Sequence, residues 1–195
     1  MPNLSLHDAL PICDFFVENG DKAFRGNQVY EWLWHKAAHS FDDMTSLSKA
    51  TRKMLDENFV INHIEVDTMQ RSNDGTIKNA IKLHDGLIVE SVLIPTEKRT
   101  TACVSSQVGC SLDCKFCATA RLKRMRNLNA DEIYDQVVAI DKQSRLYHNH
   151  KLSNIVFIIV CIFSSSSNVN NFIFDSLSTL FSFIPFKLFK IILLL

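Results

Sequence analysis

The chain has 195 residues, 47% of them hydrophobic, which is enough for one domain with a sizeable core or one small domain and part of a second. Its 21 basic and 21 acidic residues balance, which excludes a global charge signal for nucleic acid or membrane binding. It has six cysteines but opens with no charged-then-apolar signal segment, so we expect thiols in a reducing cytoplasm rather than a disulfide framework.

Residues 13–58 show the pattern of a helical unit. The segment Asp14–Gly20 ends in a glycine suited to a left-handed C-cap. Apolar residues then recur at helical spacing and predict further helices; they are Phe24, Val29, Trp32, Leu33, Leu47, Met54 and Leu55. The pair Trp32 and Trp34 is expected to pack in a core rather than stack on bases. His35 and His39 could bind a metal from one helix face, but a solvated face is the favoured interpretation.

From Ile61 the pattern changes to strands. Asn73–Gly75 and His84–Gly86 are hairpin signals, because glycine readily adopts the positive φ that such turns need. Segments rich in β-branched residues lie between and after these turns, at Thr76–Leu83, Leu87–Ile94 and Thr100–Ser105. The sequence therefore predicts a small antiparallel β-unit that leads directly into a loop rich in cysteine.

A helix and a strand are predicted after this loop. Asn129 with Glu132 three residues later is a capping-box pair that starts a helix with an apolar stripe. Residues Asn154–Val160 form a short apolar run, typical of a buried parallel strand. Strand, loop, helix and strand in this order open a parallel barrel. We therefore predict an α/β protein with a helical unit, an antiparallel β-unit and the start of a partial (β/α) barrel.

The composition changes after the predicted strand. Residues 161–195 are rich in Ser, Phe, Asn and Leu, and their only charges are Asp175, Lys187 and Lys190. All five glycines lie at or before Gly109, so this segment lacks the usual turn chemistry of barrel loops. Phe172–Leu195 is long enough to cross a bilayer, although charges and Pro185 interrupt it. A tail-anchored membrane protein is therefore a minor alternative.

Cys110, Cys114 and Cys117 form a C-x₃-C-x₂-C spacing that brings three thiolates to one short loop. Cysteine thiolates are the usual ligands of iron–sulfur clusters, and three of them leave one iron of a four-iron cluster open to a small chelating cofactor. Zinc would normally need a fourth protein ligand close by, so zinc with a distant histidine is the less favoured alternative. Phe116 supports the cluster, because radical S-adenosylmethionine enzymes carry an aromatic residue there.

Basic residues crowd the cysteine loop; they are Lys115, Arg121, Lys123, Arg124 and Arg126. They suit contacts to phosphates close to a reacting base. A run of charges is also commonly a solvated face, so this pattern alone does not establish RNA binding.

The segment Ala102–Ala120 resembles the signature of the radical-SAM, dual-specificity rRNA/tRNA adenine-C2 methyltransferases, the RlmN family. The similarity continues in four further segments, at Lys22–Trp34, Glu90–Pro95, Arg126–Asn129 and Ser153–Phe157. It spans about residues 13–158 and is far more specific than three cysteines alone.

The resemblance implies that Cys110, Cys114 and Cys117 hold a 4Fe-4S cluster that chelates and cleaves S-adenosylmethionine. In this family a second cysteine near the C-terminus carries the methyl group that is transferred to C2 of adenine. Glu90 aligns with the family's proton acceptor, and Cys103 with the thiol that resolves a protein–RNA adduct through a transient disulfide. Without the resemblance, Glu90 would be an exposed strand charge and Cys103 a small buried hydrophobe.

The resemblance also implies partners and a domain organisation. The partners are 23S rRNA, tRNA and a reducing electron donor such as flavodoxin, in the cytoplasm and without stable membrane association. Residues 13–60 resemble a helix–hairpin–helix-like accessory domain that docks RNA, residues 61–98 a β-hairpin extension, and residues 99–160 the start of the radical-SAM core. The target adenine must be unstacked to expose C2, so a loop or anticodon arm is expected.

Two segments depart from the family pattern. The family continues with a Gly-x-Gly-Glu-Pro run, where this chain reads Ile158–Ser167, and Cys161 follows the strand too closely to replace the methyl-carrying cysteine. Residues 1–12 are an unmatched leader, in which Ser5–Ile12 resembles translated adapter sequence. We therefore expect a methyltransferase by ancestry, with a tail read out of frame and no activity; a non-catalytic RNA-binding remnant is the alternative.

Overall fold

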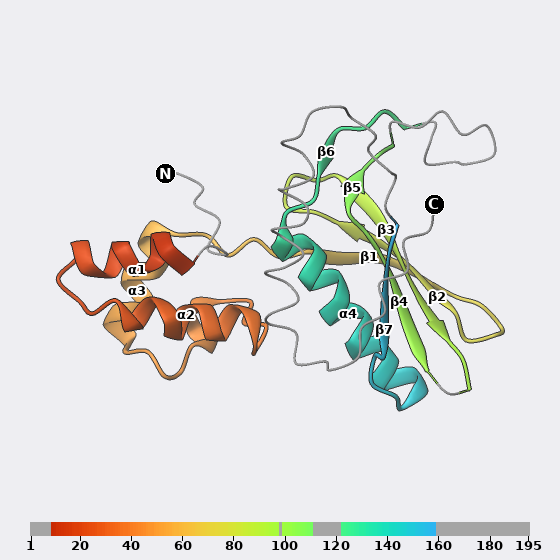
Figure 1. Cartoon of the computed structure of the whole chain (residues 1–195), viewed down its shortest axis with the longest axis horizontal. Helices are drawn as coiled ribbons and strands as arrows, with labels where there is room; N and C mark the ends of the chain where they lie inside the picture. Colours follow the sequence, from red (N-terminus) through yellow and green to blue (C-terminus); the bar gives the residue numbers. More distant parts are fainter. Residues whose placement is uncertain (1–8, 98, 111–121, 159–195) are drawn as a thin grey trace. The chain divides into compact units, whose positions relative to one another are not determined.

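The computed structural model describes residues 9–97, 99–110 and 122–158 (Figure 1). The fold is of the mixed α/β class, as predicted. The chain divides into two compact units, Met1–His63 and Ile64–Leu195. Among the described residues, no helix is long and apolar enough to cross a bilayer. The predicted spanning segment Phe172–Leu195 lies outside these residues.

The N-terminal unit is helical, as its apolar spacing predicts. Its elements are α1 (Ala9–Glu18), α2 (Phe24–Trp34), the 3₁₀ helix η1 (Phe41–Asp43) and α3 (Lys49–Asn58). Helix α1 begins before the predicted start at Cys13, so it includes the end of the predicted leader, where Ile12 is buried. Gly20 has a φ of +76° just after α1, which confirms the left-handed glycine at the helix end.

The core of this unit forms where α1 and α2 pack together. Gly26 permits their close approach, since a Cβ at this position would lie 2.5 Å from Cys13 Sγ and 2.8 Å from Cys13 N. Trp34 is buried, which confirms its predicted core packing. Trp32 is partly exposed; its Nε1 donates to Ser46 Oγ at 2.7 Å, and Lys36 Nζ lies over its ring.

The two histidines after α2 are exposed, as the favoured interpretation predicts. They do not share a helix face, because α2 ends at Trp34. His35 is the C-cap residue, and His39 lies in the following loop, with its ring centroid 6.0 Å from that of His63. The alternative of a metal bound between these two histidines on one helix is therefore wrong.

The second unit contains a five-stranded sheet and one long helix. The strands are β1 (Glu65–Arg71), β2 (Ile77–Lys82), β3 (Ile88–Pro95), β4 (Thr100–Ser105) and β7 (Asn154–Ile158), and the helix is α4 (Ala130–His148). The sheet order is β1-β2-β3-β4-β7; β4 and β7 are parallel and the other pairs antiparallel. Gly75 and Gly86 have φ of +84° and +81°, which confirms both predicted hairpin turns.

Helix α4 covers one face of this sheet and contacts β3 and β4 (Figure 1). Asn79 of β2 and Gln143 of α4 exchange two hydrogen bonds, of 2.9 and 2.8 Å, which identifies the covered face. The fully buried side chains Ile77, Ile81 and Leu93 lie on it too, since side chains alternate along strands. The alternate positions of β2, β3 and β4 therefore present their side chains to the opposite face.

Candidate functional site

The base of the cysteine loop is a two-stranded ribbon, called the stem below and formed by residues 106–110 and 122–128. Its strands are β5 (Gln107–Val108) and β6 (Arg126–Asn127), which pair antiparallel. Backbone bonds extend this pairing, from Cys110 N to Leu122 O at 3.1 Å, from Met125 N to Val108 O at 2.9 Å and from Leu128 N to Ser106 O at 2.9 Å. The stem thus places Cys110 and Leu122, the residues that flank segment 111–121, side by side.

Gly109 is required for this close pairing. Its φ is +73°, and a Cβ there would clash with the carbonyl oxygen of Lys123. We expect Gly109→Ala to destabilise the folded chain by more than Gly86→Ala, which has a similar φ but no atom within 4 Å of the added Cβ. The control, Gly86→Ala, should lower the free energy of unfolding by about 1 kcal/mol, because alanine is strained at this positive φ. Urea unfolding measures both variants, and equal losses would show that the stem does not depend on the Lys123 contact.

Cys110 is the one predicted cluster ligand within the described residues, and it lies at the tip of the stem with 6% of its surface exposed. Cys114 and Cys117 belong to segment 111–121, which is outside the described residues. In the sequence they follow Cys110 by four and seven residues. Three cysteine thiolates at this spacing are a donor set that fits an iron–sulfur cluster. The assembly of the three cysteines itself stays a prediction.

The structure brings Glu90 and Cys103 to the sheet face opposite α4. Val92 of β3 pairs with Cys103 of β4, and Ser105 Oγ donates to Glu90 O at 2.7 Å. Glu90 and Cys103 are therefore diagonal neighbours on adjacent strands, a relation that places side chains about 7–8 Å apart. Burial raises the pKa of the Cys103 thiol, so this sulfur is protonated at neutral pH.

Lys78 is a residue at this face that sequence reasoning missed. Its Nζ lies 2.6 Å from Glu90 Oε1, and both side chains are about half exposed. The signal was present in the alternation of β2, where Lys78, Ala80 and Lys82 occupy the positions between buried residues. The hairpin register then brings Lys78 next to Glu90 across the strands.

Arg126 was predicted to contact phosphate, but the structure engages its guanidinium within the protein. Two nitrogens of Arg126 each lie 2.7 Å from one of the two carboxylate oxygens of Glu132. Arg126 Nη2 also lies 2.7 Å from Asp85 Oδ2, and His84 Nδ1 lies 3.3 Å from Glu132 Oε1. The hydrogen bonds to Glu132 and Asp85 raise the pKa of Arg126, so it stays charged.

Two of the other basic residues near the stem, Lys123 and Arg124, are exposed. Arg124 Nη2 donates to Asn127 Oδ1 at 2.7 Å within the stem. Lys115 and Arg121 lie outside the described residues. Among the described basic residues, Lys123 and Arg124 are therefore exposed at the surface, whereas Arg126 forms ion pairs within the protein.

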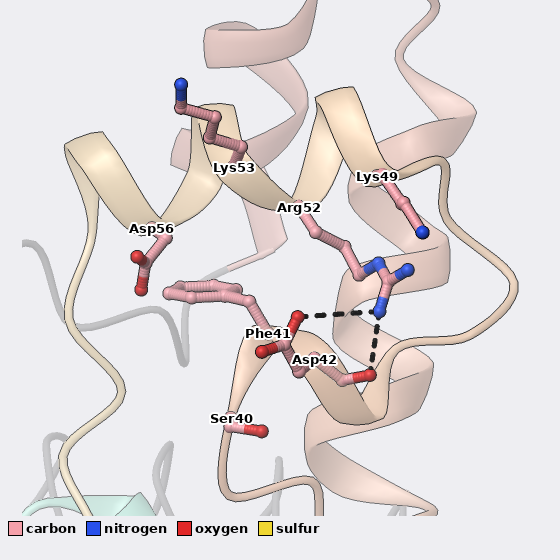
Figure 2. Close-up of a pocket in the computed structure, with 7 residues that line it drawn as sticks. All are labelled: Ser40, Phe41, Asp42, Lys49, Arg52, Lys53 and Asp56. Atoms are coloured by element: carbon pink, nitrogen blue, oxygen red, sulfur yellow. Dashed lines mark hydrogen bonds and ion pairs between the residues drawn. The ribbon is translucent and has the colours of Figure 1, made fainter.

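A separate cavity of about 440 Å³ lies in the N-terminal unit, between η1 and α3 (Figure 2). Its lining residues are Ser40, Phe41, Asp42, Lys49, Arg52, Lys53 and Asp56. Figure 2 shows Arg52 reaching toward Asp42, where Nη1 donates to the carbonyl oxygen at 2.9 Å and lies 3.5 Å from Oδ1. Lys53 pairs with Glu57 at 3.7 Å. Charges of both signs line this cavity, and none of its residues belongs to the predicted site.

Comparison with solved structures defines the class of the fold. The chain is similar to a radical SAM methyltransferase from Sphaerobacter thermophilus, with a TM-score of 0.65 and 34% sequence identity. The match covers 79% of this chain and 44% of that chain. The strands, the stem and helix α4 thus form a fold of the radical SAM methyltransferase class.

Sequence comparison finds similar proteins. Residues 3–61 match the model described as the ribosomal RNA large subunit methyltransferase N-terminal domain, so the match includes most of the predicted leader. The chain is 83% identical over 144 residues to a probable dual-specificity RNA methyltransferase RlmN of Flavobacterium johnsoniae, which is 74% of this chain and 41% of the relative. A Bacillus velezensis relative of the same description is 43% identical over 72% of this chain and 39% of its own length. Over the matched residues the chain is therefore similar to proteins described as RlmN.

The chain spans about two fifths of the length of these relatives, as the shares of 41% and 39% show. The similarity therefore concerns the matched part of the chain. What the whole relatives do is a basis for proposals about this chain.

Proposed function

We propose that this chain carries the cluster-binding part of a radical S-adenosylmethionine methyltransferase that acts on C2 of adenine in 23S rRNA and tRNA. The observation that carries the proposal is the stem, which holds Cys110 at its tip and pairs it with Leu122, directly before and after the segment that contains Cys114 and Cys117. The 83% identity to a probable dual-specificity RNA methyltransferase supports it. Cys110, Cys114 and Cys117 would hold a 4Fe-4S cluster, which supplies a 5′-deoxyadenosyl radical from S-adenosylmethionine.

Glu90 and Cys103 would serve this chemistry from the sheet face opposite α4. Glu90 would accept a proton there, with its carboxylate held beside the ammonium of Lys78. Cys103 would act as the resolving thiol, and it must lose its proton before its sulfur attacks. Their diagonal placement on β3 and β4 supports a shared site, because one substrate base could reach both side chains.

The RNA partners and the domain roles belong to the same proposal. Residues 13–60 would dock RNA, residues 61–98 would extend the core, and residues 99–160 would begin it. The exposed Lys123 and Arg124 would contact phosphates beside the reacting base. A reduced electron donor such as flavodoxin and a cytoplasmic location would follow from the chemistry of the cluster. RNA binding by the chain that weakens steeply with salt would support this docking.

Anaerobic reconstitution of the chain with iron and sulfide tests the proposed function. We expect roughly four irons per chain and broad visible absorbance, as cysteine-ligated clusters give. A colourless chain that holds zinc alone would overturn the radical mechanism, since zinc has no redox chemistry.

A further inference from the structure

Helix α4 anchors the chain just before the stem and also on the stem's returning side. Before the stem, at the end of β4, Ser105 N donates to Gln136 Oε1 at 2.9 Å, and Gln136 Nε2 donates to Ser105 O at 3.1 Å. On the returning side, Arg126 makes its two 2.7 Å bonds to Glu132. Glu132 and Gln136 are four residues apart and so lie on one face of α4, one turn above the other.

The two anchoring groups on α4 are buried, whereas the Arg126 side chain is 28% exposed. Gln136 is fully buried and Glu132 is 3% exposed. Glu132 Oε2 also accepts the backbone N–H of Asn129 at 2.9 Å, so one carboxylate caps α4 and holds Arg126. A buried carboxylate of this kind depends on its cation, because removal of the partner leaves an uncompensated charge.

A third element joins the same group. Arg126 Nε donates to Asp85 Oδ2 at 2.8 Å, and Asp85 lies in the turn between β2 and β3. The guanidinium thus ties the returning side of the stem to both a helix and a hairpin. Its planar fork makes paired contacts with fixed directions, which a lysine cannot reproduce.

We propose that Arg126, Glu132 and Gln136 form a clamp that keeps the stem closed and thereby positions Cys110 for a metal cluster. The cluster part of this inference rests on the proposed function, whereas the closure of the stem does not. These three side chains are positioning residues, which act through the backbone at the two sides of the stem. Removal of groups that orient metal ligands commonly lowers metal affinity by about 10- to 100-fold.

The test compares Arg126→Gln with Arg145→Gln in the full chain. Arg145 also pairs with a carboxylate, at 2.7 Å from Asp141, but on a part of α4 remote in sequence from the stem contacts. After anaerobic reconstitution, we expect Arg126→Gln to lose iron to a chelator about tenfold faster than the parent chain, and Arg145→Gln to match the parent. Arg126→Lys should not restore retention, because the ammonium lacks the fork. Glu132→Gln removes the other partner of this ion pair, so we expect it to lose iron faster as well.

Hydrogen exchange in the cluster-free chain separates this inference from the proposed function. We expect Arg126→Gln to speed exchange at Cys110, Met125 and Leu128, whose N–H groups close the stem, while amides of β2 and β3 keep the parent rates. Faster stem exchange in a chain that binds no cluster would retain the clamp and reject the proposed function. If Arg126→Gln binds a cluster, loses iron at the parent rate and shows the parent rates of hydrogen exchange in the stem, the clamp is rejected. Uniformly faster exchange over the whole unit would also reject it, because it shows general destabilisation.

Discussion

A chain with Cys110, Cys114 and Cys117 all replaced by alanine is expected to bind no 4Fe-4S cluster, where the parent binds roughly four irons. Thiolates are the ligands of such a cluster, and the stem gives the first of them a fixed place at the mouth of the loop. The measurement is the iron and sulfide content per chain after anaerobic reconstitution, together with the visible absorbance. The loss should be complete, because the described residues contain no group of three or more side chains that could hold a metal in their place.

Two further thiols provide matched controls for this variant. Cys13 lies in α1 of the N-terminal unit, and Cys103 lies on β4 at the face opposite α4. Replacing either with alanine should leave the iron content at the parent value, since neither belongs to the loop. If the triple variant retained as much iron as the parent, or if Cys103→Ala lost it, the proposed ligand set would be wrong.

The elements that the sequence predicted correctly are those fixed by local chemistry. Gly75 and Gly86 adopt the positive φ that their hairpin turns require, and both turns formed where predicted. Asn129 and Glu132 form the predicted capping box, and α4 begins directly after it at Ala130. In each case the signal lies within about four residues, so it does not depend on the rest of the fold.

The stem shows why other features could not be predicted. Its strands β5 and β6 have two residues each, which is too short for a period of alternating side chains to be recognised. The run from Arg121 to Arg126 reads as one basic stretch, yet Arg126 pairs with Asp85, 41 residues earlier in the chain. The β2–β3 hairpin and the start of α4 bring Asp85 and Glu132 to Arg126 in the folded chain. The spacing of these residues along the sequence therefore does not predict their pairing.

Two residues of the candidate site were predicted from the family resemblance, and a third was missed. The resemblance supplied Glu90 and Cys103, and the register of β3 and β4 places them on one face, which periodicity alone could have anticipated. Lys78 could not be assigned from its own surroundings, because an exposed lysine on a strand is common. Its relation to Glu90 depends on the register between β2 and β3.

Replacement of Asp135 is expected to have a large effect on the stability of the folded chain. Burial raises the pKa of Asp135 from 3.8 to about 7, and the nearby carboxylates of Asp131 and Glu132 add to the shift. The N–H of Ile64 and the charge of Lys142 act in the opposite direction but do not cancel it. The folded chain therefore binds a proton at Asp135 at pH values where the unfolded chain has lost it.

The sign of the pH dependence follows from this difference. Below about pH 4 the carboxyl is protonated in both states, and the folded state carries no penalty. Between about pH 4 and pH 7 the unfolded chain releases the proton while the folded chain retains it, so stability falls as the pH rises. Above about pH 7 the folded state carries the full cost of ionising this partly buried carboxyl. A pKa rise from 3.8 to about 7 corresponds to at most about 4 kcal/mol.

Asp135→Asn should therefore stabilise the chain at pH 8 by about 2–4 kcal/mol and change it little at pH 4. The amide keeps an oxygen that can accept the N–H of Ile64, now 3.4 Å from Asp135 Oδ2, without the charge. Urea unfolding at a series of pH values measures the effect. Asp67→Asn is the control, because Asp67 lies on the exposed strand β1, and its profile should follow the parent. An Asp135→Asn chain whose stability still falls between pH 4 and pH 7 as steeply as the parent's would show that another group causes the dependence.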